Sequence, residues 1–188
     1  MESNFSTKII GANPAEKRSE MDYYPTPPEA TIALLDFLEI PKGTKIWEPA
    51  CGQDHMVNVM RGKGYEVIGT DIQTGNDFFQ TDTPDGTEWI ITNPPFSLAA
   101  EFIEECAKRE KNFALLLKSQ FWHAKKRYGL FNTYTPDRVL PMTWRPNFKW
   151  ETLGSSSPLM DVIWCVWHYP YTKSAPLYIP LLKPEVTA

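Results

Sequence analysis

A short apolar run ends in a tetrapeptide whose residue types could activate an amino group. Asn93-Pro94-Pro95-Phe96 follows Trp89-Ile90-Ile91 closely, and neither a strand nor a helix continues through two prolines, because each lacks an N–H and fixes its own φ. The Asn93 side-chain oxygen and the Pro94 carbonyl could accept both hydrogens of an exocyclic amine and so direct its lone pair at an electrophile. Phe96 could stack on a flipped base. The alternative is a proline-stiffened loop in which the asparagine only caps a helix.

Acidic residues upstream of this loop could bind a second reactant that contains a nucleoside. The turn Glu48-Pro49-Ala50-Cys51-Gly52 offers a carboxylate for an ammonium group and a glycine that lets a ligand approach the main chain. Asp71 falls at the end of the next expected strand, where nucleotide-binding α/β folds hold a ribose diol. Asp77 could accept from an adenine amino group, with Ile72 and Phe78 on either side of the ring. Both aspartates could equally serve only as turn caps.

Other common chemistries lack support in the sequence. The three cysteines are far apart and odd in number, and the three histidines are isolated, so we expect neither disulfides nor a metal site. The phosphate-binding glycine motifs of NAD and ATP proteins are missing. No apolar run approaches the length of a membrane span, and the N-terminus has no signal-peptide pattern. We therefore expect a cytoplasmic protein without a metal or a membrane partner.

A basic and aromatic segment follows residue 117 and suggests contact with a nucleic acid. The 188-residue chain has a net charge of −4, yet Lys118 to Lys149 contain seven bases and one acid. Local fields of this kind attract a polyanion, and interleaved aromatics can stack on bases. The alternative is a solvated charged face with its aromatics in the core. The candidate nucleic-acid contacts are Lys118, Phe121, Trp122, Lys125, Lys126, Arg127 and Arg145.

The elements around these residues predict a mostly parallel α/β sheet. Hydrophobic patterning predicts strands at 45–48, 65–72, 89–91, 112–117, 138–140 and 159–167, and helices at 27–39, 54–63 and 98–109. Thr26 is the expected N-cap of the first helix, with Pro27 at its first position, and Ser97 is the expected cap of the last. About fifteen residues separate Ile72 from Glu88, which is too few for a full strand and helix crossover. Ligands of such sheets bind beyond the carboxyl ends of the strands.

The order of these segments resembles the S-adenosylmethionine-dependent N6-adenine DNA methyltransferases, of the small type carried by phages and prophages. The resemblance implies a Rossmann-like sheet whose last strand is inserted antiparallel. It implies that Tyr24-Pro25-Thr26-Pro27-Pro28 contacts the methionine end of the donor, and it matches Glu48–Gly52 to the donor-binding motif I of the family. It also assigns Asp71-Ile72 to the ribose, Asp77-Phe78 to the adenine and Asn93-Pro94-Pro95-Phe96 to catalysis.

The sequence departs from the family in two regions. Gln53-Asp54-His55 stands where many relatives have a further glycine, and the third strand with its helix is cut down. Residues 1–20 are polar and have no hydrophobic period, so we expect a mobile arm there, and 170–188 are expected to form a Pro-rich extension. The methyltransferase domain is expected at 21–169. No separate target-recognition domain is visible, so recognition falls on residues 118–158. We therefore expect short or relaxed sequence specificity.

Several functions fit the same motifs. DNA is the expected partner, with RNA as the alternative, because similar Asn-Pro-Pro-Phe/Tyr loops occur in RNA base methyltransferases. They also occur in glutamine methyltransferases of release factors, which the basic segment disfavours. A third possibility is a module that binds the donor or DNA and catalyses no reaction. The oligomeric state stays open.

Overall fold

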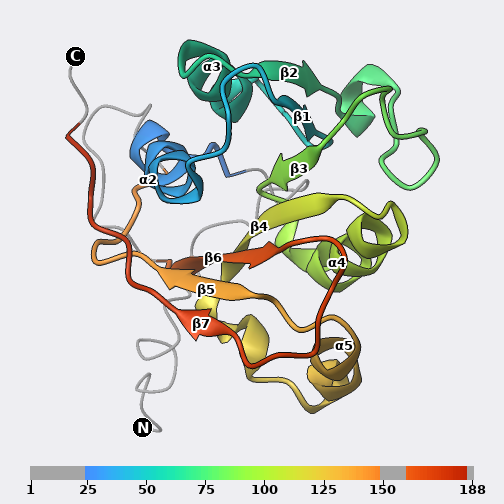
Figure 1. The fold of residues 1–188 in the computed structure, drawn as a ribbon, viewed down its shortest axis with the longest axis vertical. Helices are drawn as coiled ribbons and strands as arrows, with labels where there is room; N and C mark the ends of the chain where they lie inside the picture. Colours follow the sequence, from blue (N-terminus) through green and yellow to red (C-terminus); the bar gives the residue numbers. More distant parts are fainter. Residues whose placement is uncertain (1–23, 149–159, 186–188) are drawn as a thin grey trace, which may run out of the picture.

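One twisted sheet forms the centre of the protein. The computed structural model describes residues 24–148 and 160–185. Within these ranges seven strands follow the order β2-β1-β3-β4-β6-β5-β7 (Figure 1). Neighbouring strands are parallel, except that β6 runs antiparallel to both β4 and β5. The strands are β1 (Lys45–Glu48), β2 (Glu66–Gly69), β3 (Trp89–Thr92), β4 (Asn112–Lys118), β5 (Arg138–Pro141), β6 (Val162–Trp167) and β7 (Leu177–Tyr178). The expected Rossmann-like α/β sheet with an inserted antiparallel strand is confirmed.

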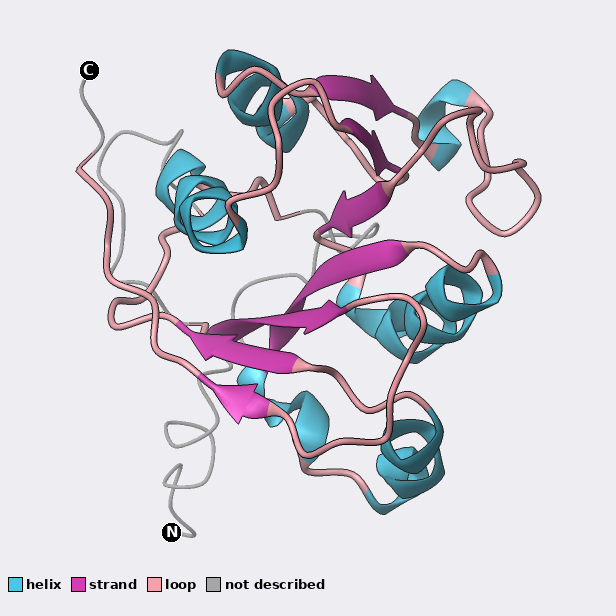
Figure 2. Cartoon of the chain, in the orientation of Figure 1, coloured by secondary structure: helices cyan, strands magenta, loops and turns pink. Residues whose placement is uncertain are grey.

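Helices cover both faces of the sheet. On one side lie α2 (Pro28–Leu38) and α3 (His55–Gly62), and on the other lie α4 (Ala99–Lys108) and α5 (Tyr128–Thr133), as Figures 1 and 2 show. Among the described helices, none combines the length and the apolar character needed to cross a membrane. Single 3-10 turns mark the carboxyl edge of the sheet. They are η1 (Ile72–Thr74), η2 (Phe96–Leu98), η3 (Ser119–Trp122) and η4 (Lys125–Arg127).

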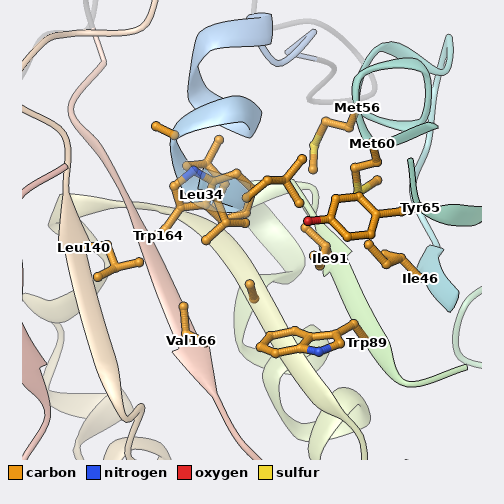
Figure 3. Packing of buried hydrophobic residues seen from close by; sticks show 14 of the residues in the cluster. Leu34, Ile46, Met56, Met60, Tyr65, Trp89, Ile91, Leu140, Trp164 and Val166 are labelled. Atoms are coloured by element: carbon orange, nitrogen blue, oxygen red, sulfur yellow. The ribbon is translucent and has the colours of Figure 1, made fainter. Parts of the chain in front are cut away.

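Side chains of the central strands alternate between two hydrophobic cores. Ile46 and Ile91 face α2 and α3, where they pack with Leu34, Met60 and Trp164 (Figure 3). The strand neighbours of these two isoleucines point the other way and pack with Phe102 of α4. This alternation is the consequence of the two-residue period of a strand. Strands β1 and β3 are therefore buried up to their carboxyl ends, which is where the candidate site lies.

The segment between β2 and β3 contains no third strand. After η1 the described chain passes through turns as far as Trp89, and Figure 2 shows it as a loop beside the sheet. The edge of the sheet on this side is therefore β2. The expectation of a cut-down third strand and helix is confirmed.

Three expected boundaries were wrong. Pro27 takes the N-cap position of α2 and Pro28 begins the helix, so Thr26 is not the cap. Ser97 lies inside η2, and Leu98 takes the N-cap position of α4. Strand β2 ends at Gly69, two residues before Asp71. The Thr26 hydroxyl accepts from Asn93 Nδ2 instead of capping α2. The Leu98 N–H donates to the Pro95 carbonyl oxygen in η2, and Asp71 caps η1 by accepting from the Gln73 N–H.

The C-terminal segment contributes to the sheet. Leu177 and Tyr178 pair in parallel with Arg138 and Val139 and form the edge strand β7. The chain that the sequence suggested as an extension thus supplies the last strand. The expected arm at 1–20 and residues 149–158 of the expected recognition segment lie outside the described residues.

Candidate active site

A pocket opens at the carboxyl ends of β1, β2 and β3. The loops that follow these strands meet there because the strands are parallel neighbours. Residues from four separate parts of the sequence, 24–26, 48–56, 71–79 and 93–102, form its walls. The expected site residues that line it are Thr26, Glu48, Pro49, Ala50, Gly52, Asp71, Ile72, Asp77, Phe78, Asn93 and Pro95. Pro27, Pro94 and Phe96 do not belong to this lining, and Phe96 contacts Tyr24 of the lining with ring centroids 5.5 Å apart.

The side-chain amide of Asn93 is held in one orientation. Its Nδ2 donates to the Tyr24 carbonyl oxygen and to Thr26 Oγ1, each at 3.0 Å. A carbonyl oxygen can only accept, so the amino group must face Tyr24 and the amide oxygen must face away. That oxygen, Oδ1, is buried and has no hydrogen-bond partner. A buried acceptor without a donor costs about 1–3 kcal/mol, so this atom is suited to a donor on a ligand.

Glu48 provides a second buried acceptor of this kind. Its side chain is 1% exposed, and Oε1 accepts from Thr92 Oγ1 at 2.5 Å and from the Ala50 N–H at 3.1 Å. The other oxygen, Oε2, is buried and has no partner. Burial raises the pKa of Glu48 to about 8, because the ionised form loses its hydration. A cation in the pocket would pair with Oε2 and stabilise the carboxylate.

Asp71 connects the loop after β2, in which it lies, to the loop after β1. Its Oδ2 accepts from the Gly52 N–H at 2.8 Å, and its Oδ1 accepts from the Gln73 N–H at 2.9 Å. Gly52 has a φ of 52°, a left-handed conformation that suits glycine. Each carboxylate oxygen retains further lone-pair capacity. The side chain can therefore cap η1 and accept from two hydroxyl groups of a ligand, so the two roles considered for Asp71 are compatible.

Three residues in and after η1 give the pocket its apolar surface. Phe78 is 3% exposed and stacks on Phe102 with centroids 4.7 Å apart, so it forms the floor. Ile72 is 64% exposed and Phe79 is 39% exposed. Asp77 closes the turn between them, accepting from the Phe79 N–H at 3.0 Å. A planar ring would find open apolar faces on Ile72 and Phe79, and the floor at Phe78.

Sequence reasoning missed several wall residues. Phe79 had a visible signal, since it directly follows Phe78, whereas Leu98 and Phe102 reach the pocket only through the position of α4. Cys51 also lies in the wall, and burial raises its thiol pKa to about 12, so the thiol stays protonated. The missed residues are His55, Met56, Gln73, Phe79, Leu98 and Phe102.

Part of the basic and aromatic segment packs inside the protein. Phe121 is 4% exposed, and Trp122 stacks on Phe131 with centroids 4.2 Å apart. The Arg127 guanidinium lies 3.9 Å from the Phe121 ring and donates to the Phe121 carbonyl oxygen at 2.7 Å. These three candidate contacts thus stabilise the loop after β4. For them, packing inside the protein is favoured over contact with a nucleic acid.

The remaining basic candidates lie at the surface or beside the Asn93 loop. Lys118 ends β4, and its Nζ lies 4.4 Å from the Phe96 ring centroid. Lys125 and Lys126 are exposed in η4. Arg145 is also exposed and pairs with Asp161 at 2.7 Å. Across the described ranges, no cluster of three or more His, Cys, Asp or Glu side chains could hold a metal ion.

Comparison with known proteins supports the fold assignment. No protein-family model matches the sequence. A structure from Listeria monocytogenes, described as a class I S-adenosylmethionine-dependent methyltransferase, matches with a TM-score of 0.61 and 13% identity over 87% of this chain and 67% of that one. A type I restriction-modification methyltransferase subunit from Streptococcus thermophilus matches with a TM-score of 0.53 and 13% identity over 77% of this chain.

A third structure, described as a modification subunit of a type I restriction enzyme from Vibrio vulnificus, gives a TM-score of 0.54 and 12% identity over 87% of this chain. This chain spans 44% of the Streptococcus subunit and 48% of the Vibrio subunit. Identity at this level shows a shared fold alone. The protein therefore has the Rossmann-like fold of S-adenosylmethionine-dependent methyltransferases.

Proposed function

We propose that the protein transfers a methyl group from S-adenosylmethionine to the exocyclic N6 amino group of adenine in DNA. The observation that carries the proposal is the buried Asn93 Oδ1, which has no partner and is fixed in orientation by Tyr24 and Thr26. It lies directly after β3, at the edge of the pocket. An amino group that donates to this oxygen would satisfy its hydrogen bonding.

The pocket fits S-adenosylmethionine group by group. Glu48 Oε2 lacks a donor and matches the ammonium of the methionine end. Asp71 can accept from the ribose hydroxyls. Ile72, Phe79 and the Phe78 floor offer apolar faces to the adenine ring, with Asp77 beside them as an acceptor. The structural neighbours described as S-adenosylmethionine-dependent enzymes support the choice of this donor.

The geometry suggests catalysis by positioning. S-adenosylmethionine supplies a methyl carbon on a positively charged sulfur. Asn93 Oδ1 and the Pro94 carbonyl accept the two amino hydrogens, which takes the nitrogen lone pair out of conjugation with the ring. The lone pair attacks the methyl carbon, the carbon–sulfur bond breaks, and its electron pair stays on sulfur. The methylated nitrogen then loses one proton to solvent, so no strong base is required.

DNA is the proposed substrate because of the charge around the loop. Lys118 lies against the Phe96 ring, and Lys125 with Lys126 extends the positive surface from the end of β4. Two structural neighbours are subunits of restriction systems, which is consistent with DNA. We propose that recognition comes from residues 118–158 and that the sequence specificity is short or relaxed. Small methyltransferases of phages and prophages are the type that the sequence resembles.

The decisive experiment measures the methylated product. Purified protein with radiolabelled S-adenosylmethionine is offered DNA and RNA in parallel, and the nucleosides are identified by mass spectrometry. We expect N6-methyladenine in DNA, its loss in Asn93→Ala, and unchanged activity in Asn58→Ala, whose side chain is exposed on α3. Methylation of RNA alone would select the RNA enzyme, and methylation of a release-factor glutamine would select the protein enzyme. Donor binding without any transfer would indicate a binding module.

A further inference from the structure

Arg109 connects the end of α4 to the loop that follows η1. Its Nη2 donates to the Phe78 carbonyl oxygen at 2.6 Å, and its Nη1 donates to the Thr81 carbonyl oxygen and to Thr83 Oγ1, each at 3.0 Å. Three successive points of one loop are thus fixed by a single planar group. Such a fork is specific to arginine, since a lysine ammonium is a point donor on a flexible stem.

The guanidinium is an interior group. The Arg109 side chain is 9% exposed, and Nη2 forms an ion pair with Glu105 at 2.9 Å. Its central carbon lies 4.6 Å from the Phe78 ring centroid and 4.9 Å from the Trp47 ring centroid. Charge-assisted hydrogen bonds in such surroundings are stronger than exposed ones. Arg109 therefore packs between α4, β1 and the loop.

The loop that Arg109 holds packs the Phe78 and Phe79 rings against Phe102, but the hydrogen bonds formed by Asp77 within it are local. Residues 77–83 contain turns and no strand, in the place of the missing third strand. Asp77 closes the local turn, and the Gln80 and Thr81 N–H groups donate to the Asp77 carbonyl oxygen at 2.9 and 2.8 Å. These bonds are internal to the loop. Arg109 supplies the hydrogen bonds to the body of the protein that a neighbouring strand would otherwise supply.

We propose that Arg109 is a positioning residue for the adenine end of the methyl donor. It does not line the pocket itself, whereas the loop residues Asp77, Phe78 and Phe79 do. By fixing the carbonyl oxygens of Phe78 and Thr81, Arg109 determines the position of the Phe78 ring in the pocket floor. It also determines the direction of the Asp77 carboxylate. This inference rests on the proposed function, because it needs the pocket to bind an adenosine group.

The test is Arg109→Lys, which keeps the charge and loses the fork. We expect binding of S-adenosylhomocysteine and of 5′-methylthioadenosine, measured by calorimetry, to weaken on the order of tenfold. The KM for the donor should rise while kcat at saturating donor stays within about twofold of the original. The matched control is Arg61→Lys. Arg61 also donates to a backbone carbonyl, that of Val67 at 2.8 Å, but lies outside the pocket, so this variant should bind both ligands normally.

The outcomes separate the inference from the proposed function. A folded Arg109→Lys protein with unchanged affinity for both ligands, or with lowered kcat and unchanged KM, overturns the role of Arg109 and leaves the proposed function standing. If Arg109→Lys does not fold, Thr83→Val removes one acceptor and leaves the arginine in place. Weaker ligand binding by Thr83→Val supports the inference, and normal binding overturns it. Failure of the unmodified protein to bind either ligand refutes donor binding itself.

Discussion

Asn93 and Thr26, 67 positions apart in the sequence, are joined by a 3.0 Å hydrogen bond from Nδ2 to Oγ1. The bond explains why Thr26 does not cap α2, because its hydroxyl accepts from the amide of the Asn93 loop. Thr26 is 4% exposed, so water does not replace it readily. The segment before α2 therefore determines the orientation of the Asn93 side chain.

Thr26→Val tests this orientation. Valine has nearly the same shape but cannot accept from Nδ2, so the Asn93 amide loses one of two anchors. We expect kcat for methyl transfer to fall on the order of tenfold, with the dissociation constant of S-adenosylhomocysteine within about twofold. Thr26→Ser keeps the hydroxyl and should restore kcat. Full activity in the valine variant would show that the Tyr24 carbonyl alone is enough.

Asn93→Asp places an acceptor where the structure has a donor. The new carboxylate oxygen would face the Tyr24 carbonyl oxygen across the 3.0 Å that Nδ2 now spans. The Thr26 hydroxyl can reverse its role, but a carbonyl cannot, so the contact raises the pKa of the new aspartate and favours its protonated form. We expect kcat to be low at pH 8 and to increase toward pH 6. A pH profile parallel to that of the original protein would contradict this geometry.

Glu48 makes stability depend on pH in a defined direction. Burial raises its pKa from 4.5 to about 8. Between these values the folded protein keeps a proton that the unfolded chain releases, so the free energy of unfolding falls as pH rises from about 4.5 to about 8 and then levels off. Glu48→Gln removes the titrating group and should flatten this slope. Urea unfolding at pH 5, 6.5 and 8 measures the difference between the two proteins, and equal slopes would place the Glu48 pKa near its ordinary value.

The exposed lysines of η4 should contribute to DNA affinity through counterion release. Each lysine that neutralises a phosphate adds about 0.9 to the slope of log affinity against log salt. Lys125→Gln with Lys126→Gln should therefore lower that slope by roughly two, as measured by fluorescence anisotropy. An unchanged slope would mean that both lysines form an ordinary solvated surface.

Arg127→Gln is the matched comparison in the same turn. Its guanidinium donates to the Phe121 carbonyl oxygen and covers the Phe121 ring. We expect this variant to lose about 1–3 kcal/mol of unfolding free energy and to keep most of its salt dependence. The two variants thus separate phosphate contact from packing within three adjacent residues.

Local patterns in the sequence were enough for most of the sheet. The strand at 45–48 was predicted at its observed bounds, and the strand predicted at 112–117 is observed as β4, one residue longer. The missing third strand followed from the short distance between Ile72 and Glu88. These features depend on side-chain periodicity and chain length, which a sequence displays directly.

The sequence by itself also determined which chemical groups stand at the carboxyl ends of β1 and β3, since Glu48 and Asn93 follow apolar runs that must be strands. Only the tertiary structure decided how these groups are used. The orientation of Asn93 depends on Thr26, and the adenine-end loop depends on Arg109, which lies at the end of α4. Phe121, Trp122 and Arg127 have the composition of a binding surface and yet pack inward. The physical reason is that hydrogen bonds and burial depend on which segments become neighbours, and residue types in sequence order do not specify those neighbours.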